Sequence, residues 1–157
     1  MSAPEPDKTD LKILAALQQD GRLTNARLAD QLSLSETPCW RRLKRLEQEG
    51  YIRNYQANLD RRKLGFGVMA FVQISCIDHD ESSTRKFEEV VQCSDNVLSC
   101  HNTTGEADFL LQVVARDLDD YSAFVENTLR KLPGVTAIRS NISLREVKSS
   151  SRLPLQE

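Results

Sequence analysis

Residues 28–50 have the sequence LADQLSLSETPCWRRLKRLEQEG. The pattern predicts two helices joined by a short connection at Ser33–Leu34. Ser35 is a favourable N-cap for the second helix, and Pro38 falls in its first turn, where a missing N–H costs nothing. Gly50 then marks the C-terminal end of that helix. Two helices with this spacing are typical of a helix-turn-helix.

A further helix is predicted upstream of this pair. Leu11, Leu14 and Leu17 recur every three residues and therefore form one apolar stripe. The helix is expected to start near Asp10 and to stop at the Asp20-Gly21 turn. The first part of the chain is thus predicted to be a three-helix unit.

The third of these helices contains a dense run of positive charge. Cys39, Leu43 and Leu46 form its apolar side, so the cationic side chains are expected to point outward or sideways. An exposed cationic helix suits contact with phosphates, and its N-terminal end usually meets base edges in the major groove. Including one residue of the following segment, the predicted DNA contacts are Ser35, Glu36, Thr37, Trp40, Arg41, Arg42, Lys44, Arg45 and Arg53.

Two alternatives to DNA contact apply to this helix. A run of charge is often only a solvated surface. DNA binding is favoured because the run lies on the third helix of a helix-turn-helix pattern. Trp40 is equally well explained as a partly buried packing residue.

The segment after this unit predicts a domain boundary. Residues 51–59 contain tyrosine and isoleucine and are predicted to form a short strand, or wing. Residues 60–67 are charged, contain glycine and form the predicted linker. The expected domains are therefore residues 1–59 and residues 68–157.

The second half alternates between strand and helix patterns. Helices are predicted to start at Ser82 and after Asp117. The predicted strands are 68–77, 97–104, 107–115 and 135–147. The order β-α-β-β-α-β is the ferredoxin-like pattern, so the fold class is α+β. Helices on one face of such a sheet leave the other face to be covered, which predicts sheet-to-sheet dimerisation.

Composition limits the class of protein. The first 62 residues contain 11 Lys and Arg against 9 Asp and Glu, and the remainder contain 10 against 14, which suggests two functions in one chain. No motif of an α/β-hydrolase, P-loop, dinucleotide-binding or HExxH enzyme is found, so no catalytic activity is expected. No apolar run approaches the roughly 20 residues that span a bilayer, and no secretory signal is found, so we expect a cytoplasmic location without membrane contact.

The cysteines and histidines do not predict a metal site. His79 and His101 are the only histidines, so a zinc site would need distant cysteines or a second chain, and no metal or cofactor is expected. A redox-sensing role for Cys100 stays open because it depends on a lowered thiol pKa. No C-x-x-C pair occurs, and most of the cysteines are predicted to be buried small apolar residues: Cys39, Cys76, Cys93 and Cys100.

A small-molecule site is predicted at residues 104–108, TGEAD. Gly105 permits a positive φ and allows backbone N–H groups to hold a carboxylate, while Asp108 can accept hydrogen bonds from an ammonium group. The alternative is a plain hairpin turn in which Asp108 caps backbone amides. With two wall residues from the preceding strand, the predicted effector contacts are Leu98, Cys100, Thr104, Gly105, Glu106, Ala107 and Asp108.

Four stretches resemble the Lrp/AsnC, or feast/famine, family of transcription regulators. DLKILAALQQDGR (10–22) and RLKRLEQEGYI (42–52) are similar to its helix-turn-helix domain. TGEADFLL (104–111) is similar to its T-G-x-x-D-Y-L-L motif, and EVKSSSRLPL (146–155) to its C-terminal end. Phe109 stands where the family often has tyrosine, so this chain lacks the hydroxyl at that position.

The resemblance implies a winged helix-turn-helix, a ferredoxin-like sensing domain and homodimers that assemble into octamers or similar rings. It also implies an amino acid or related metabolite as effector. The expected function is sequence-specific regulation of transcription on double-stranded operator DNA, with DNA binding or assembly modulated by this effector. The alternative is an architectural, nucleoid-type DNA-binding protein without effector control.

Overall fold

The chain divides into two compact units in a computed structural model that describes residues 5–77 and 81–155. The first unit comprises Met1–Asn58 and Lys148–Glu157, and the second comprises Leu59–Val147. We expected the C-terminal residues in the second domain, but their contacts lie in the first unit. Gln18 makes this contact, since its side-chain amide accepts from the backbone N–H of Leu153 at 2.6 Å and donates to the Leu153 carbonyl at 3.2 Å.

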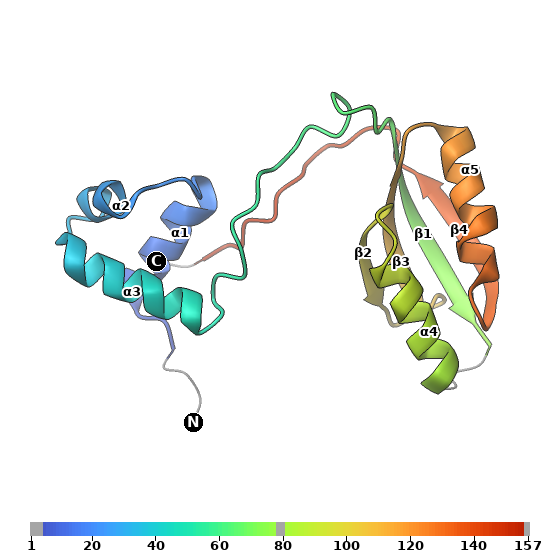
Figure 1. Cartoon of the computed structure of the whole chain (residues 1–157), viewed down its shortest axis with the longest axis horizontal. Helices are drawn as coiled ribbons and strands as arrows, with labels where there is room; N and C mark the ends of the chain where they lie inside the picture. The colour runs from blue at the N-terminus through green and yellow to red at the C-terminus, as the bar shows by residue number, and fades with distance from the viewer. Residues whose placement is uncertain (1–4, 78–80, 156–157) are drawn as a thin grey trace. The chain divides into compact units, whose positions relative to one another are not determined.

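The first unit contains α1 (Lys8–Gln19), α2 (Asn25–Gln31) and α3 (Glu36–Gln48), as the helix-turn-helix pattern predicts (Figure 1). Side chains from all three helices meet in one apolar cluster because each helix is apolar along one side. Its buried members are Ile13, Ala16, Leu28, Ala29, Cys39 and Leu46.

The helix ends follow from local side-chain chemistry. The Thr24 hydroxyl accepts from the backbone N–H of Arg27 at 3.3 Å and so caps α2. Ser35 occupies the N-cap position of α3, but its side chain makes no capping hydrogen bond. Gly50 follows α3 with a φ of 78°, a conformation that glycine adopts without steric cost.

The wing strand predicted for residues 51–59 is wrong. The backbone N–H groups of Tyr51 and Ile52 both donate to the carbonyl of Leu46, at 3.0 and 3.3 Å, and so extend the turn that ends α3. A strand needs a partner for its backbone hydrogen bonds, and residues 53–59 pair with no strand in the part of the chain that the structure describes.

The second unit is a four-stranded antiparallel sheet in the order β2-β3-β1-β4. This order and the alternation of strands and helices confirm the ferredoxin-like prediction. The last strand ends at Ile142 rather than at the predicted residue 147. In chain order the elements are β1 (Val68–Cys76), α4 (Glu81–Gln92), β2 (Val97–Asn102), β3 (Phe109–Ala115), α5 (Leu118–Asn127), the 3-10 helix η1 (Leu129–Lys131) and β4 (Val135–Ile142).

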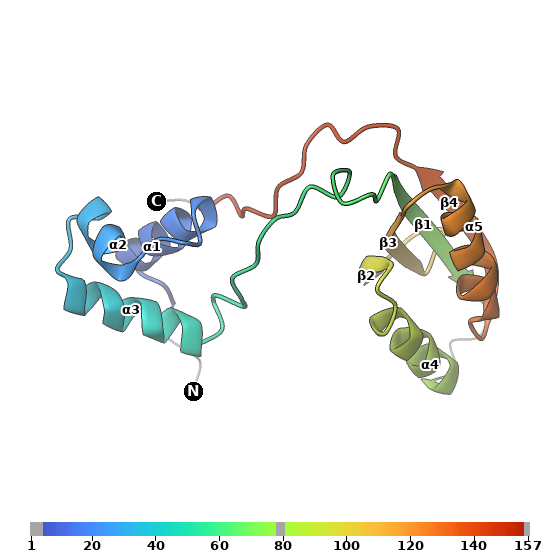
Figure 2. The same ribbon diagram turned by 45° about the horizontal axis from the view of Figure 1, so that its top comes forward.

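Helices α4 and α5 cover the same face of this sheet (Figures 1 and 2). Alternate residues of β1 and β3 point toward them, and the Phe87 ring of α4 stacks on Phe109 with centroids 4.3 Å apart. The opposite face is open, and Phe71 near its centre is 42% exposed. Gln112, which pairs with Phe71 in the register, and Gln73, two residues along β1, are partly buried polar residues.

Candidate functional site

Four of the predicted DNA contacts form one exposed stripe on α3. Their spacing of i, i+3, i+4 and i+7 places them on one side of the helix, opposite the buried Cys39 and Leu46. Trp40 is 50% exposed, which argues against the packing alternative for this side chain. We call these residues the α3 stripe: Thr37, Trp40, Arg41 and Lys44.

Two of the predicted DNA contacts, Arg42 and Arg45, point toward α1 instead of outward. Arg42 Nη1 lies 2.9 Å from Asp10 Oδ1 and 2.6 Å from Asp7 Oδ2, and Arg45 Nη2 pairs with Asp10 Oδ2. The Asp10 side chain is only 1% exposed, so its carboxylate requires these cations as partners. Arg42 and Arg45 therefore point sideways, which is one of the two orientations expected for this run, and protein carboxylates already engage their guanidinium groups.

Asp7 and Asp10 also form the capping box of α1. Each carboxylate accepts from the backbone N–H of the other residue, at 2.8 and 3.0 Å. The bond from the Asp10 N–H, together with the guanidinium of Arg42, lowers the pKa of the Asp7 carboxyl to about 2. The D-x-x-D spacing at the start of a helix is a sequence signal for this capping box. The ion pairs of Asp10 with α3 have no comparable signal, because apolar periodicity does not identify charged partners.

The remaining members of the predicted DNA surface differ in how they are held. Arg41 is exposed and forms no ion pair with any residue between 5 and 77 or 81 and 155. Lys44 Nζ lies 2.7 Å from Glu47 Oε2, and the Tyr55 hydroxyl donates to Glu47 Oε1 at 3.0 Å. Burial and this carboxylate raise the pKa of Tyr55 to about 12, so the hydroxyl keeps its proton and holds the segment after α3. Arg53 is exposed on that segment.

The first turn of α3 is fixed against α2. The side-chain amide of Asn25 donates to the backbone carbonyl of Glu36 at 3.0 Å. Ser35 and Glu36 themselves are exposed. The end of the helix that is predicted to meet base edges is thus both accessible and positioned by a neighbouring helix.

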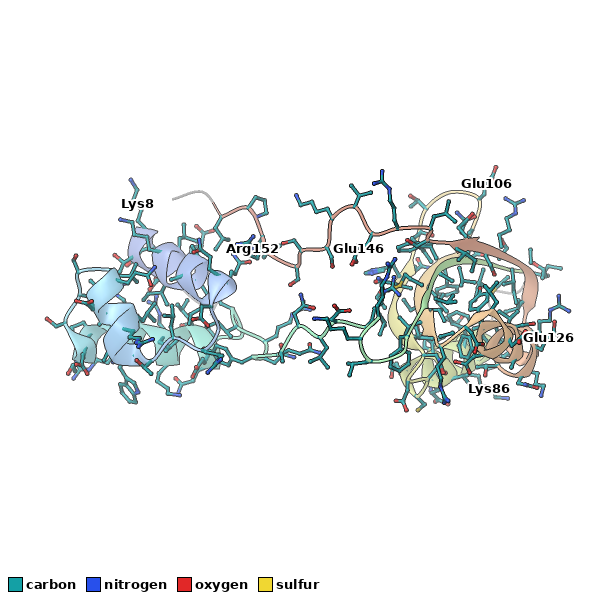
Figure 3. All side chains as sticks on the ribbon, turned by 90° about the horizontal axis from the view of Figure 1, so that it is seen from above. Lys8, Lys86, Glu106, Glu126, Glu146 and Arg152 are labelled. Atoms are coloured by element: carbon teal, nitrogen blue, oxygen red, sulfur yellow. The ribbon has the colours of Figure 1, made fainter. Side chains whose placement is uncertain are left out.

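The predicted effector turn is built mainly from contacts within the sheet unit. The Asp108 carboxylate accepts from the backbone N–H of Cys76 at 2.7 Å, and the Asp108 N–H donates to the Ile74 carbonyl at 2.9 Å. A carboxylate of Asp108 that caps a backbone amide is the arrangement expected for a plain hairpin turn, the alternative to a ligand site. The Glu106 carboxylate pairs with Arg139 at 2.9 Å and points away from the sheet (Figure 3).

The top of this turn is accessible. Thr104, Gly105 and Glu106 are exposed, and Gly105 has a φ of 124°, as the glycine at this position permits. Ala107 is partly buried, and its carbonyl accepts from the Thr103 hydroxyl at 2.9 Å. Backbone N–H groups at the exposed end, rather than the Asp108 carboxylate, are therefore the better candidates for contact with a ligand.

The structure separates the other two predicted effector contacts, Leu98 and Cys100, from the turn. Both line a cavity of about 450 Å³ between α4 and β2, and no residue from 104 to 108 lines it. Burial and the nearby Glu88 raise the pKa of the Cys100 thiol, which argues against a reactive thiolate at neutral pH.

The four cysteines differ in burial, and Cys76 and Cys100 are only partly buried. Cys39 is buried as expected, but Cys93 is exposed. Within the described ranges no group of three or more His, Cys, Asp or Glu side chains is arranged to hold a metal ion. His79 lies outside the described residues.

Comparison with known proteins assigns both units. Residues 6–53 match the winged helix-turn-helix DNA-binding family model, and residues 69–153 match the Lrp/AsnC ligand binding domain. This chain belongs to the Lrp/AsnC family. Helices α1, α2 and α3 lie within the match to the DNA-binding model, and the strands and helices of the sheet unit lie almost entirely within the match to the ligand-binding model.

Lrp/AsnC relatives match along nearly their whole length. The chain is 44% identical to the Bkd operon transcriptional regulator of Pseudomonas aeruginosa over 96% of this chain and 99% of that protein. It is 35% identical to the leucine-responsive regulatory protein of Escherichia coli, over 96% and 92%. A transcriptional regulator of Neisseria meningitidis, solved in complex with L-Met, superposes with a TM-score of 0.90 at 42% identity, over 95% and 96%.

These relatives are transcription regulators. The present chain, as a member of the Lrp/AsnC family, is a DNA-binding regulator of transcription with a ligand-binding domain. Among its described helices, none has the length and apolar character needed to cross a membrane.

Proposed function

We propose that this regulator recognises operator DNA with the α3 stripe and that an amino acid or a related metabolite modulates its DNA binding or assembly. The observation that supports DNA recognition best is the stripe itself, which presents the exposed ring of Trp40 and the exposed Arg41, a cation without an ion pair to the described residues. Ser35, Glu36 and Arg53 would contribute at its two ends, while Arg42 and Arg45 would act by holding α3 against α1.

The proposed regulator acts as a homodimer that assembles further, up to an octamer. Its open sheet face supports pairing, because Phe71 is exposed between polar neighbours that a second sheet would cover. A two-fold dimer would present two recognition helices to half-sites about one helical turn apart, or a multiple of it.

A lysine at position 71 should prevent this pairing. Phe71→Lys would place a charge inside the sheet-to-sheet interface, where it has no counterion, so we expect a smaller particle by size exclusion with light scattering. Val90→Lys is the matched control, because Val90 is 39% exposed on α4, on the helical side of the sheet. A Phe71→Lys protein of unchanged mass would show that this face is not the interface.

The proposed effector would bind where the backbone N–H groups of Thr104, Gly105 and Glu106 are accessible, next to a neighbouring subunit. Its class is supported by the L-Met complex of the Neisseria meningitidis relative. A ligand alters DNA binding only if it binds one conformation or assembly better than another.

A paired screen tests effector control against the architectural alternative. We expect at least one of the twenty amino acids to raise the melting temperature, since a ligand at about 100 times its Kd adds about 2.7 kcal/mol of stability. The same compound should change the affinity for a palindromic duplex selected from a random-sequence pool. Equal affinity for selected and unselected duplexes, with no response to any amino acid, would favour the architectural protein.

A further inference from the structure

A cavity at the edge of the sheet has the size of a small-molecule site. It lies between α4 and the edge strand β2, and its volume is about 450 Å³. Ligand pockets typically occupy roughly 300–1,000 Å³. Phe109 of β3 and Val91 of α4 contribute apolar walls, and both residues belong to the buried core of the sheet unit.

The strand register determines which side chains of β2 face the cavity. Cys100 pairs with Leu111, which is fully buried, so Cys100 lies on the face that the helices cover. The register shifts between Val97 and Ser99. Leu98, in this irregularity, lines the cavity and is nevertheless 55% exposed. An apolar side chain therefore stands at the mouth, where a ligand would cover it.

The charge of the side chains that line the cavity favours a cationic ligand over an anionic one. Among the described residues that line the cavity, Glu88 is the only one with a charged side chain, and none is a lysine or arginine. Glu88 is an exposed residue that lines the cavity, and its charge contributes, after burial, to the raised pKa of the Cys100 thiol. An anionic ligand would meet this charge without a compensating cation, whereas an ammonium group would be attracted to it.

We infer that the cavity between α4 and β2 binds a small primary amine with an apolar chain. The ammonium group pairs with the Glu88 carboxylate, and the apolar chain covers Val91, Leu98 and Phe109. This site is separate from the Thr104–Glu106 end of the turn, and it does not depend on whether that turn binds an effector.

The test uses isoamylamine as the probe and isovalerate, an anion of similar shape, as its counterpart. Saturation-transfer NMR on the full chain should give methyl signals for the amine and much weaker signals for the acid. Glu88→Gln should lower the affinity for the amine by about threefold or more, whereas Glu89→Gln, one residue along α4, should leave it unchanged.

A second pair of variants tests the location. Cys100→Met fills the cavity with a flexible side chain and should abolish the amine signal. Cys93→Met changes an exposed cysteine that does not line the cavity and should have no effect. Equal signals for the amine and the acid, equal effects of Glu88→Gln and Glu89→Gln, or an unchanged signal in Cys100→Met would each overturn the inference.

Discussion

Replacement of Asp10 by alanine is expected to lower the free energy of unfolding of the helical unit by about 3 kcal/mol. The buried carboxylate accepts from Arg42, Arg45 and the backbone N–H of Asp7. Removing one partner of a buried ion pair typically costs about 3–5 kcal/mol. The side chains of the two arginines are 34% and 36% exposed, so water compensates part of the loss and the lower end of that range applies.

Urea unfolding followed by tryptophan fluorescence measures this effect in the relevant unit. Trp40 is the only tryptophan of the chain and lies on α3. Asp30→Ala, at an exposed position of α2, should change the unfolding free energy by no more than about 0.5 kcal/mol. If Asp10→Ala were as mild as this control, the ion-pair cluster would not contribute to stability.

Replacement of Arg41 by alanine is expected to lower the affinity for operator DNA by about tenfold without changing stability. Arg41 is exposed on the α3 stripe and has no ion pair within the described ranges, so its replacement removes a proposed DNA contact and breaks no described ion pair. Fluorescence anisotropy with a labelled duplex gives the affinity, and urea unfolding gives the stability.

Arg42→Ala is the matched variant, because it lies one residue along the same helix and has the same charge. We expect it to destabilise the helical unit through the loss of its contacts with Asp7 and Asp10. At a temperature where the unit stays folded, its DNA affinity should fall less than that of Arg41→Ala. The opposite ranking would mean that Arg42 leaves its carboxylate partners to contact DNA.

The order of helices and strands could be predicted because each depends on a local pattern. The apolar stripe of α1, the caps at Thr24 and Asp117 and the β-branched run of β1 are all visible within a few residues. The wing was predicted from composition in the same way. It does not form because the strand preference of Tyr51 and Ile52 is outweighed by the turn that ends α3.

Which residues form the candidate site could not be predicted from local patterns, because it depends on contacts between residues far apart in the sequence. Whether an arginine of α3 faces DNA or protein depends on the carboxylate of Asp10, which lies about thirty residues earlier in the chain. The sequence-based prediction places Leu98 and Cys100 in the walls of the same effector pocket as the turn. They line a different cavity because the register of β2 directs Cys100 to the helix-covered face.

The salt dependence of DNA binding tests the division of the α3 cations most directly. For each variant, the logarithm of the binding constant is measured against the logarithm of salt concentration on one selected duplex. A phosphate contact contributes about 0.9 to the slope, so Arg41→Ala should flatten it by about one, whereas Arg42→Ala should keep the slope of the unmodified protein. A flattened slope in Arg42→Ala together with an unchanged slope in Arg41→Ala would contradict the account.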